Sequence, residues 1–213
     1  MLKIIFITTS IFLAFCAKAN YNNDELMRSS MEKVLESTEI IEIEGAIKDL
    51  LDIAKTENKR WEPLYYAAYG QISLANKMES SKDKDAELDK ARTCIEQAKI
   101  LAPDHSEILA LDGYLLIVRL QVDPASRGMH YSQEIFDTLY KAVRLDQSNP
   151  RAHMLLGRMK IGIGKFMGTG SGNACQSIQT AMNLYNNVEE TENPYAPRWG
   201  KTSTQMVLKN QCN

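Results

Sequence analysis

Three stretches decide the fold: Ala98-Lys-Ile-Leu-Ala-Pro103, Ala142-Val-Arg-Leu-Asp-Gln-Ser-Asn-Pro150 and Ala152-His-Met-Leu-Leu-Gly157. In the first two, an alanine and a leucine three residues apart close an amphipathic run, and a proline stops the helix soon afterwards. Apolar residues recur at helical spacing around them, as in Ile135–Val143, whereas the alternation typical of strands is absent. The sequence therefore predicts an all-α protein.

Small residues recur with a fixed period. One series consists of alanines near the expected helix ends, spaced by 44 residues, and the other of glycines inside the helices, spaced by 43 and 44 residues. The two series are Ala54, Ala98 and Ala142, and Gly70, Gly113 and Gly157. A small residue at a fixed point of each helix lets the next helix approach closely, as a stack of helical hairpins requires.

These stretches resemble the boundary of the tetratricopeptide repeat (TPR), where a helix ends in Ala-x-x-Leu-x-Pro, and Leu156-Gly157 matches the Leu-Gly step of the following helix. The resemblance covers about residues 44–187 and departs from the family at Asp112-Gly113. The family period is about 34 residues. The longer period here puts extra residues at 78–85, 122–131 and 162–172.

The resemblance implies a right-handed stack of about four TPR-like helical hairpins, an α-solenoid. Roughly eight helices are expected, with a short ninth near Val207. A C-terminal segment would cap the stack, with Trp199-Gly200 covering its exposed end.

A narrower resemblance rests on Trp61-Glu-Pro-Leu-Tyr-Tyr-Ala-Ala-Tyr69, Val122-Asp-Pro-Ala-Ser-Arg-Gly128 and Pro197-Arg-Trp-Gly200. These stretches are similar to exported TPR proteins of Bacteroidetes-type bacteria. A more distant similarity, of fold alone, is to the T components of TRAP-type transporters, which also stack helical hairpins. Such repeats serve many unrelated partners, so the resemblance implies the fold and leaves the partner unnamed.

Residues 1–19 have the pattern of a secretory signal peptide. Lys3 supplies the positive start, the apolar stretch after it is too short to span a bilayer, and Ala17-Lys18-Ala19 fits the small-x-small cleavage rule. Cleavage there would leave residues 20–213 as a single exported helical-repeat domain without a transmembrane span. The periplasm is the expected compartment, and secretion or a lipid anchor at Cys16 are the alternatives.

The overall charge excludes one class of partner. The chain has 25 Lys and Arg residues against 27 Asp and Glu, a net charge of -2. A protein that binds nucleic acid needs a basic surface for the phosphates, so we expect no nucleic acid partner. Hydrophobic residues make up 44% of the chain, enough to bury one core.

The cysteines fit an oxidising compartment. Cys175 and Cys212 form a candidate disulfide, with two free thiols as the equal alternative, and Cys94 lies in an amphipathic run where a cysteine acts as a small core residue. No two cysteines have CxxC spacing, and the three histidines are too far apart for a local zinc motif. We therefore predict no metal site and no cofactor.

Five residues are candidates for partner binding. Tyr65, Tyr66 and Tyr69 share one face of a helix, where aromatic residues usually pack in a core but on a concave face would form a binding platform. Arg127 and Arg151 stand beside turns. An arginine beside a turn either donates hydrogen bonds to the unpaired backbone carbonyl groups at a helix C-terminus or binds an acidic ligand.

The glycine cluster Gly162–Gly172 is neither of the two common phosphate-binding loops. No glycine precedes Gly164-Lys165 by five residues, as a Walker loop requires, and no strand precedes the cluster, as a dinucleotide fingerprint requires. We expect a mobile connection between the helices of the last repeat, with an anion or peptide contact as the alternative.

The sequence favours binding over catalysis, since it contains no Gly-x-Ser-x-Gly elbow and no His-Glu-x-x-His motif. We predict a non-catalytic scaffold that presents a groove to a peptide or protein. One alternative is a small-molecule or anion-binding accessory protein of a transport system, with an apolar pocket around Tyr66, Arg127 and Arg151. A lesser alternative is a hydrolase, which needs a titratable pair in a cleft.

Overall fold

A computed structural model describes residues 23–170, 173–187 and 193–212. The signal peptide predicted for residues 1–19, with Cys16, lies outside the described residues. Within the described ranges no helix is both long and apolar enough to cross a membrane.

The described residues are helical without strands, which confirms the predicted all-α class. A helix over 23–36 comes first. The others are α2 (Ile40–Thr56), α3 (Glu62–Lys77), α4 (Ser81–Leu101), α5 (Ser106–Val122), α6 (Pro124–Leu145), α7 (Pro150–Met167), α8 (Ala174–Asn187) and α9 (Lys201–Gln211).

Side chains at the helix ends explain several of these boundaries. The Ser80 side chain accepts a hydrogen bond from the backbone N–H of Asp83 at the start of α4. Asn149 accepts from the N–H groups of Arg151 and Ala152 at the start of α7, where Pro150 occupies a position that needs no donor. Gly168 ends α7 with a left-handed φ of 67°, a conformation that glycine adopts without strain.

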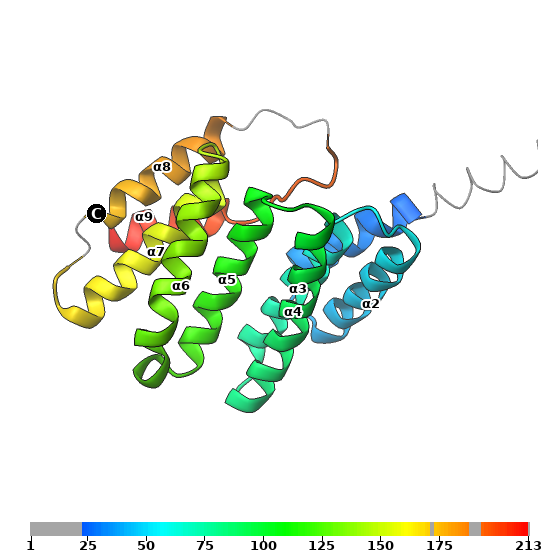
Figure 1. The fold of residues 1–213 in the computed structure, drawn as a ribbon, viewed down its shortest axis with the longest axis horizontal. Helices are drawn as coiled ribbons and strands as arrows, with labels where there is room; N and C mark the ends of the chain where they lie inside the picture. The colour runs from blue at the N-terminus through cyan, green and yellow to red at the C-terminus, as the bar shows by residue number, and fades with distance from the viewer. Residues whose placement is uncertain (1–22, 171–172, 188–192, 213) are drawn as a thin grey trace, which may run out of the picture.

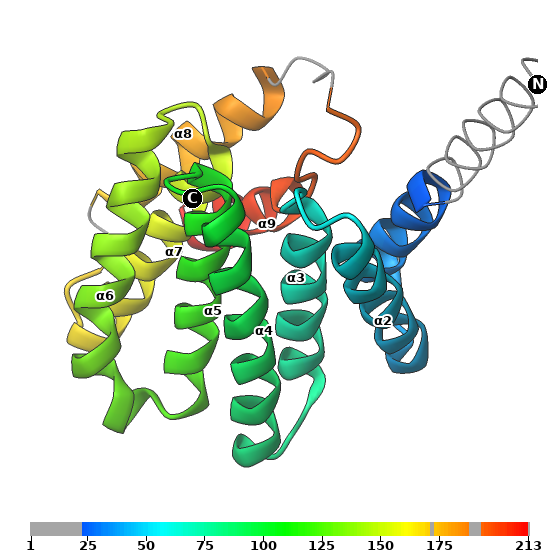
Figure 2. The same ribbon diagram turned by 45° about the vertical axis from the view of Figure 1, so that its right-hand side comes forward.

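Consecutive helices pack as antiparallel hairpins in a helical-repeat stack (Figures 1 and 2). The pairs α3–α4, α5–α6 and α7–α8 form the hairpins, and α2 packs on α3. The first helices of successive hairpins also touch each other, because α5 contacts both α3 and α7. These three helices, α3, α5 and α7, form the inner row of the stack.

The glycine series allows close packing, although its first member differs from the other two. A Cβ atom added to Gly113 or Gly157 would overlap the second helix of the same hairpin, at Leu139 or Ile178. One added to Gly70 would instead meet Ile47 of α2, in the preceding hairpin. Gly113 and Gly157 therefore allow close packing within their own hairpins, whereas Gly70 allows close packing against the preceding unit.

The extra residues of the long repeat mostly lengthen helices. Ranges 78–85 and 122–131 fall largely in α4 and α6. The expected loop over Gly162–Gly172 was wrong in its first half, because Gly162 and Gly164 lie inside α7, which ends only at Met167. The helix continues through these glycines because α7 is held by its packing against α8, and Gly164 itself is buried.

The C-terminal helix α9 caps the stack by packing on α8. A disulfide between Cys175 and Cys212, with Cα atoms 5.5 Å apart, joins the start of α8 to the end of α9. Cys94 is a buried free thiol. The expectation that Trp199 covers the exposed end was wrong, because its indole is buried against α3 and α5, where it stacks on Tyr114 and meets the ring of Tyr69 at a tilt.

Candidate functional site

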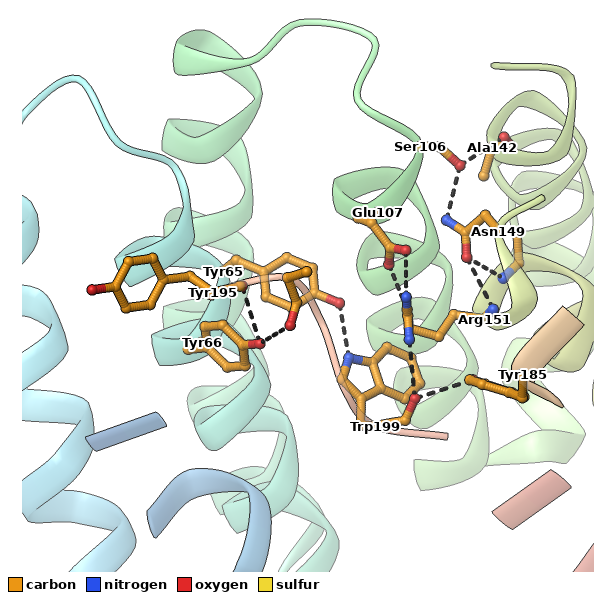
Figure 3. A network of polar contacts seen from close by, with 12 residues as sticks. Tyr65, Tyr66, Ser106, Glu107, Ala142, Asn149, Arg151, Tyr185, Tyr195 and Trp199 are labelled. Atoms are coloured by element: carbon orange, nitrogen blue, oxygen red, sulfur yellow. Dashed lines mark hydrogen bonds and ion pairs between the residues drawn. The ribbon is translucent and has the colours of Figure 1, made fainter. Parts of the chain in front are cut away.

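A segment that we call the strap, residues 193–200, crosses the inner row of helices (Figure 3). The Tyr66 hydroxyl donates to the backbone oxygen of Ala196 at 3.0 Å and reaches that of Tyr195 at 3.3 Å. The Trp199 indole N–H donates to the Tyr65 hydroxyl at 2.8 Å. The strap therefore covers the tyrosine face of α3 from inside the same chain.

Arg151 of α7 holds the other end of the strap. Its guanidinium forms a two-point ion pair with Glu107 of α5, at 2.6 and 2.7 Å, and donates to the backbone oxygen of Trp199 at 3.3 Å. The Tyr185 hydroxyl donates to the same oxygen at 3.1 Å. Burial alone would lower the pKa of Arg151, but the hydrogen bond and charge of Glu107 raise it above its ordinary value.

The three candidate tyrosines, Tyr65, Tyr66 and Tyr69, all lie at the contact between α3 and the strap. Tyr65 and Tyr66 are fully buried, and Tyr69 is partly buried against the ring of Trp199, with ring centroids 5.3 Å apart. Burial raises the pKa of each tyrosine well above its usual 10.0, so the hydroxyls stay protonated near neutral pH. An outside partner would have to displace the strap before touching them.

Arg127 lies apart from this cluster. It forms a two-point ion pair with Asp85 of α4, at 2.7 and 2.6 Å, and donates to the backbone oxygen of Arg119 near the end of α5 at 3.0 Å. The Asp85 carboxyl has its pKa lowered by the hydrogen bond from Arg127. Arg127 thus ties three helices together, while Arg151 and the tyrosines meet at the strap.

A separate hollow, which we call the groove, is lined by residues of α2, α3 and α4 and of the turn after α2. In Figure 2, α2 and α4 lie on either side of α3. It has a volume of about 690 Å³. Most of its exposed surface is apolar, although six of its twelve lining residues have polar or charged side chains. The lining residues are Leu51, Ala54, Lys55, Asn58, Leu64, Gln71, Lys90, Thr93, Cys94, Gln97, Ile100 and Leu101.

Three polar groups of the groove have distinct environments. Gln71 of α3 is only 4% exposed, and its side-chain carbonyl oxygen is buried without a hydrogen-bond partner. Burial raises the pKa of the Cys94 thiol from 9.0 to about 11, so the sulfur carries its proton at neutral pH. Lys90 extends toward solvent and pairs with Glu87 at 2.7 Å.

The contact between α4 and α5 contrasts with the groove because ion pairs bridge it. The buried Asp112 carboxylate of α5 contacts Arg92 and Lys99 of α4, both at 2.7 Å. Arg119 of α5 reaches Asp89 of α4 at 2.6 Å. Between α2 and α4, by comparison, no ion pair joins the described residues. The groove is therefore an apolar gap, and it lies beside a helix contact that ion pairs hold together.

The sequence contained only an ambiguous signal for the groove. Leu51 and Ala54 belong to one run of apolar residues at helical spacing, and Cys94 belongs to another. Such spacing is typical of a buried helix face. Ile100 follows the second run and is 77% exposed at the groove edge. Ile100 and the neighbouring Leu101, which is 37% exposed and also lines the groove, are the apolar residues that could have indicated a binding surface.

The described ranges place no three His, Cys, Asp or Glu side chains where they could share a metal ion. The groove itself offers one thiol, that of Cys94, and polar side chains of Asn, Gln, Thr and Lys. The arrangement suits an apolar ligand that is held by contact area and a small number of polar interactions.

Comparison with known proteins finds a similar solved structure. No protein-family model and no curated protein matches the chain. Among solved structures the chain is similar to the HusA haemophore from Porphyromonas gingivalis, with a TM-score of 0.76 and 26% sequence identity. The match covers 87% of this chain and 90% of that chain. This similarity supports a helical binding protein of Bacteroidetes type, and it does not bear on the TPR or TRAP resemblance.

Proposed function

We propose that the chain is an exported binding protein whose groove holds a flat, largely apolar small molecule, with haem as the candidate cargo. The observation that carries the proposal is the groove itself, an apolar hollow of about 690 Å³. Small-molecule sites in proteins commonly measure about 300–1,000 Å³ and combine apolar walls with a few polar groups. The similarity to a haemophore provides the second support.

The lining suits the two faces and the edge of a porphyrin. Leu51, Leu64 and Ile100 offer apolar contact from three different helices, which a planar ring needs on both sides. Lys55 and Lys90 also line the groove, and each now pairs with an acidic residue of its own helix. The Lys55–Asp52 pair is exposed and therefore weak, so the Lys55 ammonium group is free to exchange its partner for a propionate. Lys90 is held more firmly, because the side chain of its partner Glu87 is only 9% exposed.

The residues of the groove favour recognition of the ring over ligation of its iron. The described residues that line it include no histidine and no methionine. Cys94 remains a protonated thiol, because burial raises its pKa to about 11, and a thiol is a poorer ligand than a thiolate. We therefore expect metal-free protoporphyrin to bind comparably to haemin.

A peptide or protein partner on the inner row is the rival proposal. It requires Tyr65, Tyr66, Tyr69 and Arg151 to be accessible, and these side chains contact the strap. The small-molecule alternative asked for a pocket at Tyr66, Arg127 and Arg151, and the groove lies elsewhere, between α2 and α4. We favour the groove because its lining is open to a ligand without rearrangement.

The proposal includes export and the repeat type. Removal of residues 1–19 would leave a periplasmic carrier built from TPR-type hairpins. Fractionation of the native envelope, followed by determination of the mature N-terminus, tests both the compartment and the cleavage site.

Titration of haemin, followed by its absorbance change, tests the proposed function. Ile100→Glu places a charge at the groove edge and should weaken binding about tenfold or more. Ile41→Glu is the matched control, because Ile41 is 76% exposed against 77% for Ile100 and does not line the groove. Equal affinities for both variants, or no binding by the wild type, would refute the proposal.

A further inference from the structure

The end of the stack formed by α7, α8 and α9, which we call the basic end, differs in charge from the rest of the chain. Residues 150–187 and 193–212 contain seven lysines and arginines and no aspartate or glutamate. In residues 23–149, by contrast, acidic side chains outnumber basic ones by eight. The three helices lie together at the end of the stack opposite α2 (Figure 1). Such a separation of charge turns the basic end toward a negatively charged surface.

Most of the positive charge at the basic end has no acidic partner. Arg151 pairs with Glu107, but five other basic side chains form no ion pair within the described ranges. These five are Arg158, Lys160, Lys165, Lys201 and Lys209. The three glutamates of residues 188–192 lie outside the described residues and follow the C-terminal end of α8, a helix of 14 residues and therefore about 20 Å long. The start of α8 and the end of α7 beside it are thus far from an acidic side chain of that segment along the helix.

Two large apolar side chains protrude from the basic end. Phe166 is 83% exposed and Met167 is 67% exposed, and both follow Lys165 in the last turn of α7. Lys165 Nζ donates to Gln211 Oε1 at 3.0 Å, which fixes the end of α7 to the end of α9, and the disulfide joins the end of α9 to the start of α8. Residues 165–167, which we call the tip, therefore form an anchored apolar projection with unpaired positive charge beside it.

The size of the tip distinguishes between two kinds of anionic partner. A stable interface with a folded protein buries about 800 Å² on each side. One large aromatic side chain supplies about 150–250 Å², so Phe166 and Met167 together fall well short of that area. Reversible binding to a bilayer needs less, because a few apolar side chains enter the headgroup region while lysines attract anionic headgroups. The tip has the composition and the area for a bilayer.

We propose that the basic end docks on the surface of an anionic lipid bilayer, with Phe166 and Met167 inserted among the headgroups and Lys165 beside the lipid phosphates. The apolar pair supplies contact area, and the unpaired basic groups select a negatively charged surface over a neutral one. The groove belongs to α2, α3 and α4 and the turn after α2, so lipid binding and cargo binding use different helices and can be tested separately.

Sedimentation with lipid vesicles tests the proposal. The chain from residue 20 onward is used, because the apolar stretch before it would itself bind lipid. Wild-type protein should bind vesicles of equal parts phosphatidylglycerol and phosphatidylcholine about tenfold or more tightly than phosphatidylcholine alone, and added salt should weaken this binding. Phe166→Ser should weaken binding to the anionic vesicles about tenfold, and Lys165→Glu should do so about tenfold or more.

Matched control variants lie on α2, at the opposite end of the stack. Ile41 is 76% exposed, close to the 83% of Phe166, so Ile41→Ser removes a comparable apolar side chain from the acidic part of the chain. Lys48 is exposed, and Lys48→Glu makes the same change in net charge as Lys165→Glu. Both controls should keep the affinity for anionic vesicles within about twofold of wild type.

Several outcomes would overturn the proposal. Wild-type protein that binds neither kind of vesicle, or both equally, shows no recognition of an anionic bilayer. An effect of Phe166→Ser no larger than that of Ile41→Ser would mean that the tip does not insert. Binding of polyglutamate as tight as that of anionic vesicles, and insensitive to Phe166→Ser, would assign the basic end to an acidic polypeptide instead. Loss of haemin binding with vesicle binding retained would refute the groove as the haem site and leave this proposal supported.

Discussion

The strap should contribute a large share of the stability of the fold, and Trp199 is the residue through which this can be measured. Trp199 is 8% exposed, and its ring centroid lies 5.3 Å from that of Tyr69 and 5.6 Å from that of Tyr114. Replacement of a packed tryptophan by alanine costs about 3–5 kcal/mol. We expect Trp199→Ala to lower the free energy of unfolding by that amount, because three inner helices lose their common contact.

Two milder variants isolate the hydrogen bond within this contact. Trp199→Phe keeps an aromatic ring but removes the N–H that donates to the Tyr65 hydroxyl at 2.8 Å, and Tyr65→Phe removes the acceptor. Each should cost about 1–3 kcal/mol, and the double variant should cost about 1 kcal/mol less than their sum. Trp61→Phe is the control, since Trp61 meets Tyr65 and His105 by ring contacts.

Urea unfolding followed by circular dichroism measures these free energies. A docked strap predicts one cooperative transition that shifts in the order wild type, Trp61→Phe, Trp199→Phe, Trp199→Ala. A loss below about 1 kcal/mol for Trp199→Ala, or zero coupling between Trp199 and Tyr65, would contradict the docking of the strap.

Three further predictions concern pH, the disulfide and the free thiol. Because burial raises the pKa of Tyr65 and Tyr66 above 10.0, their contribution to stability is complete below that pH and is lost as the pH rises above it, by about 1.4 kcal/mol per pH unit for each. Tyrosinate absorbance and circular dichroism should therefore change together in alkali, and separate changes would contradict this. The Cys175→Ala, Cys212→Ala double variant should lose about 2–4 kcal/mol in urea unfolding, and an unchanged midpoint would show that the disulfide closes no loop of consequence. Maleimide labelling of Cys94 at neutral pH should run about a hundredfold slower than that of an unperturbed thiol, since burial raises its pKa from 9.0 to about 11, and bound protoporphyrin should slow it further. Labelling at the ordinary rate would contradict the burial of the thiol, and a rate unchanged by protoporphyrin would contradict binding in the groove.

The sequence was sufficient for the helices and their stacking, because both depend on local signals. Pro150 and the Asn149 cap mark the start of α7, and the alanine and glycine series predicts the close approach of paired helices. The partners of each glycine were not predictable. Gly70 shares the period of Gly113 yet packs toward the preceding hairpin, a difference that depends on how α2 is placed.

The strap was not predictable, because its contacts join residues far apart in sequence. Trp199 bonds to Tyr65, 134 positions earlier, and Tyr66 bonds to Ala196, 130 positions later. Spacing along one helix showed that the tyrosines share a face, but it could not show that the C-terminal segment covers it. The same tyrosine pattern would have indicated a binding platform if the chain had ended before residue 193.

The groove was missed for a related reason. Leu51, Ala54 and Cys94 have the period of a buried helix face, and periodicity cannot distinguish a face covered by another helix from one that two helices leave open. The gap arises because α2 and α4 both pack mainly on α3. That arrangement is a property of the stack, not of any one helix.

The central claim is that the groove, and not the strap-covered inner row, is the binding site. An amide chemical-shift map by NMR, recorded while metal-free protoporphyrin is added, tests it most directly. We predict that the largest shifts fall on Ala54, Gln71, Cys94 and Gln97, with small shifts at Tyr66 and Trp199. Shifts concentrated on the strap and the inner row, with the groove residues unchanged, would contradict the account.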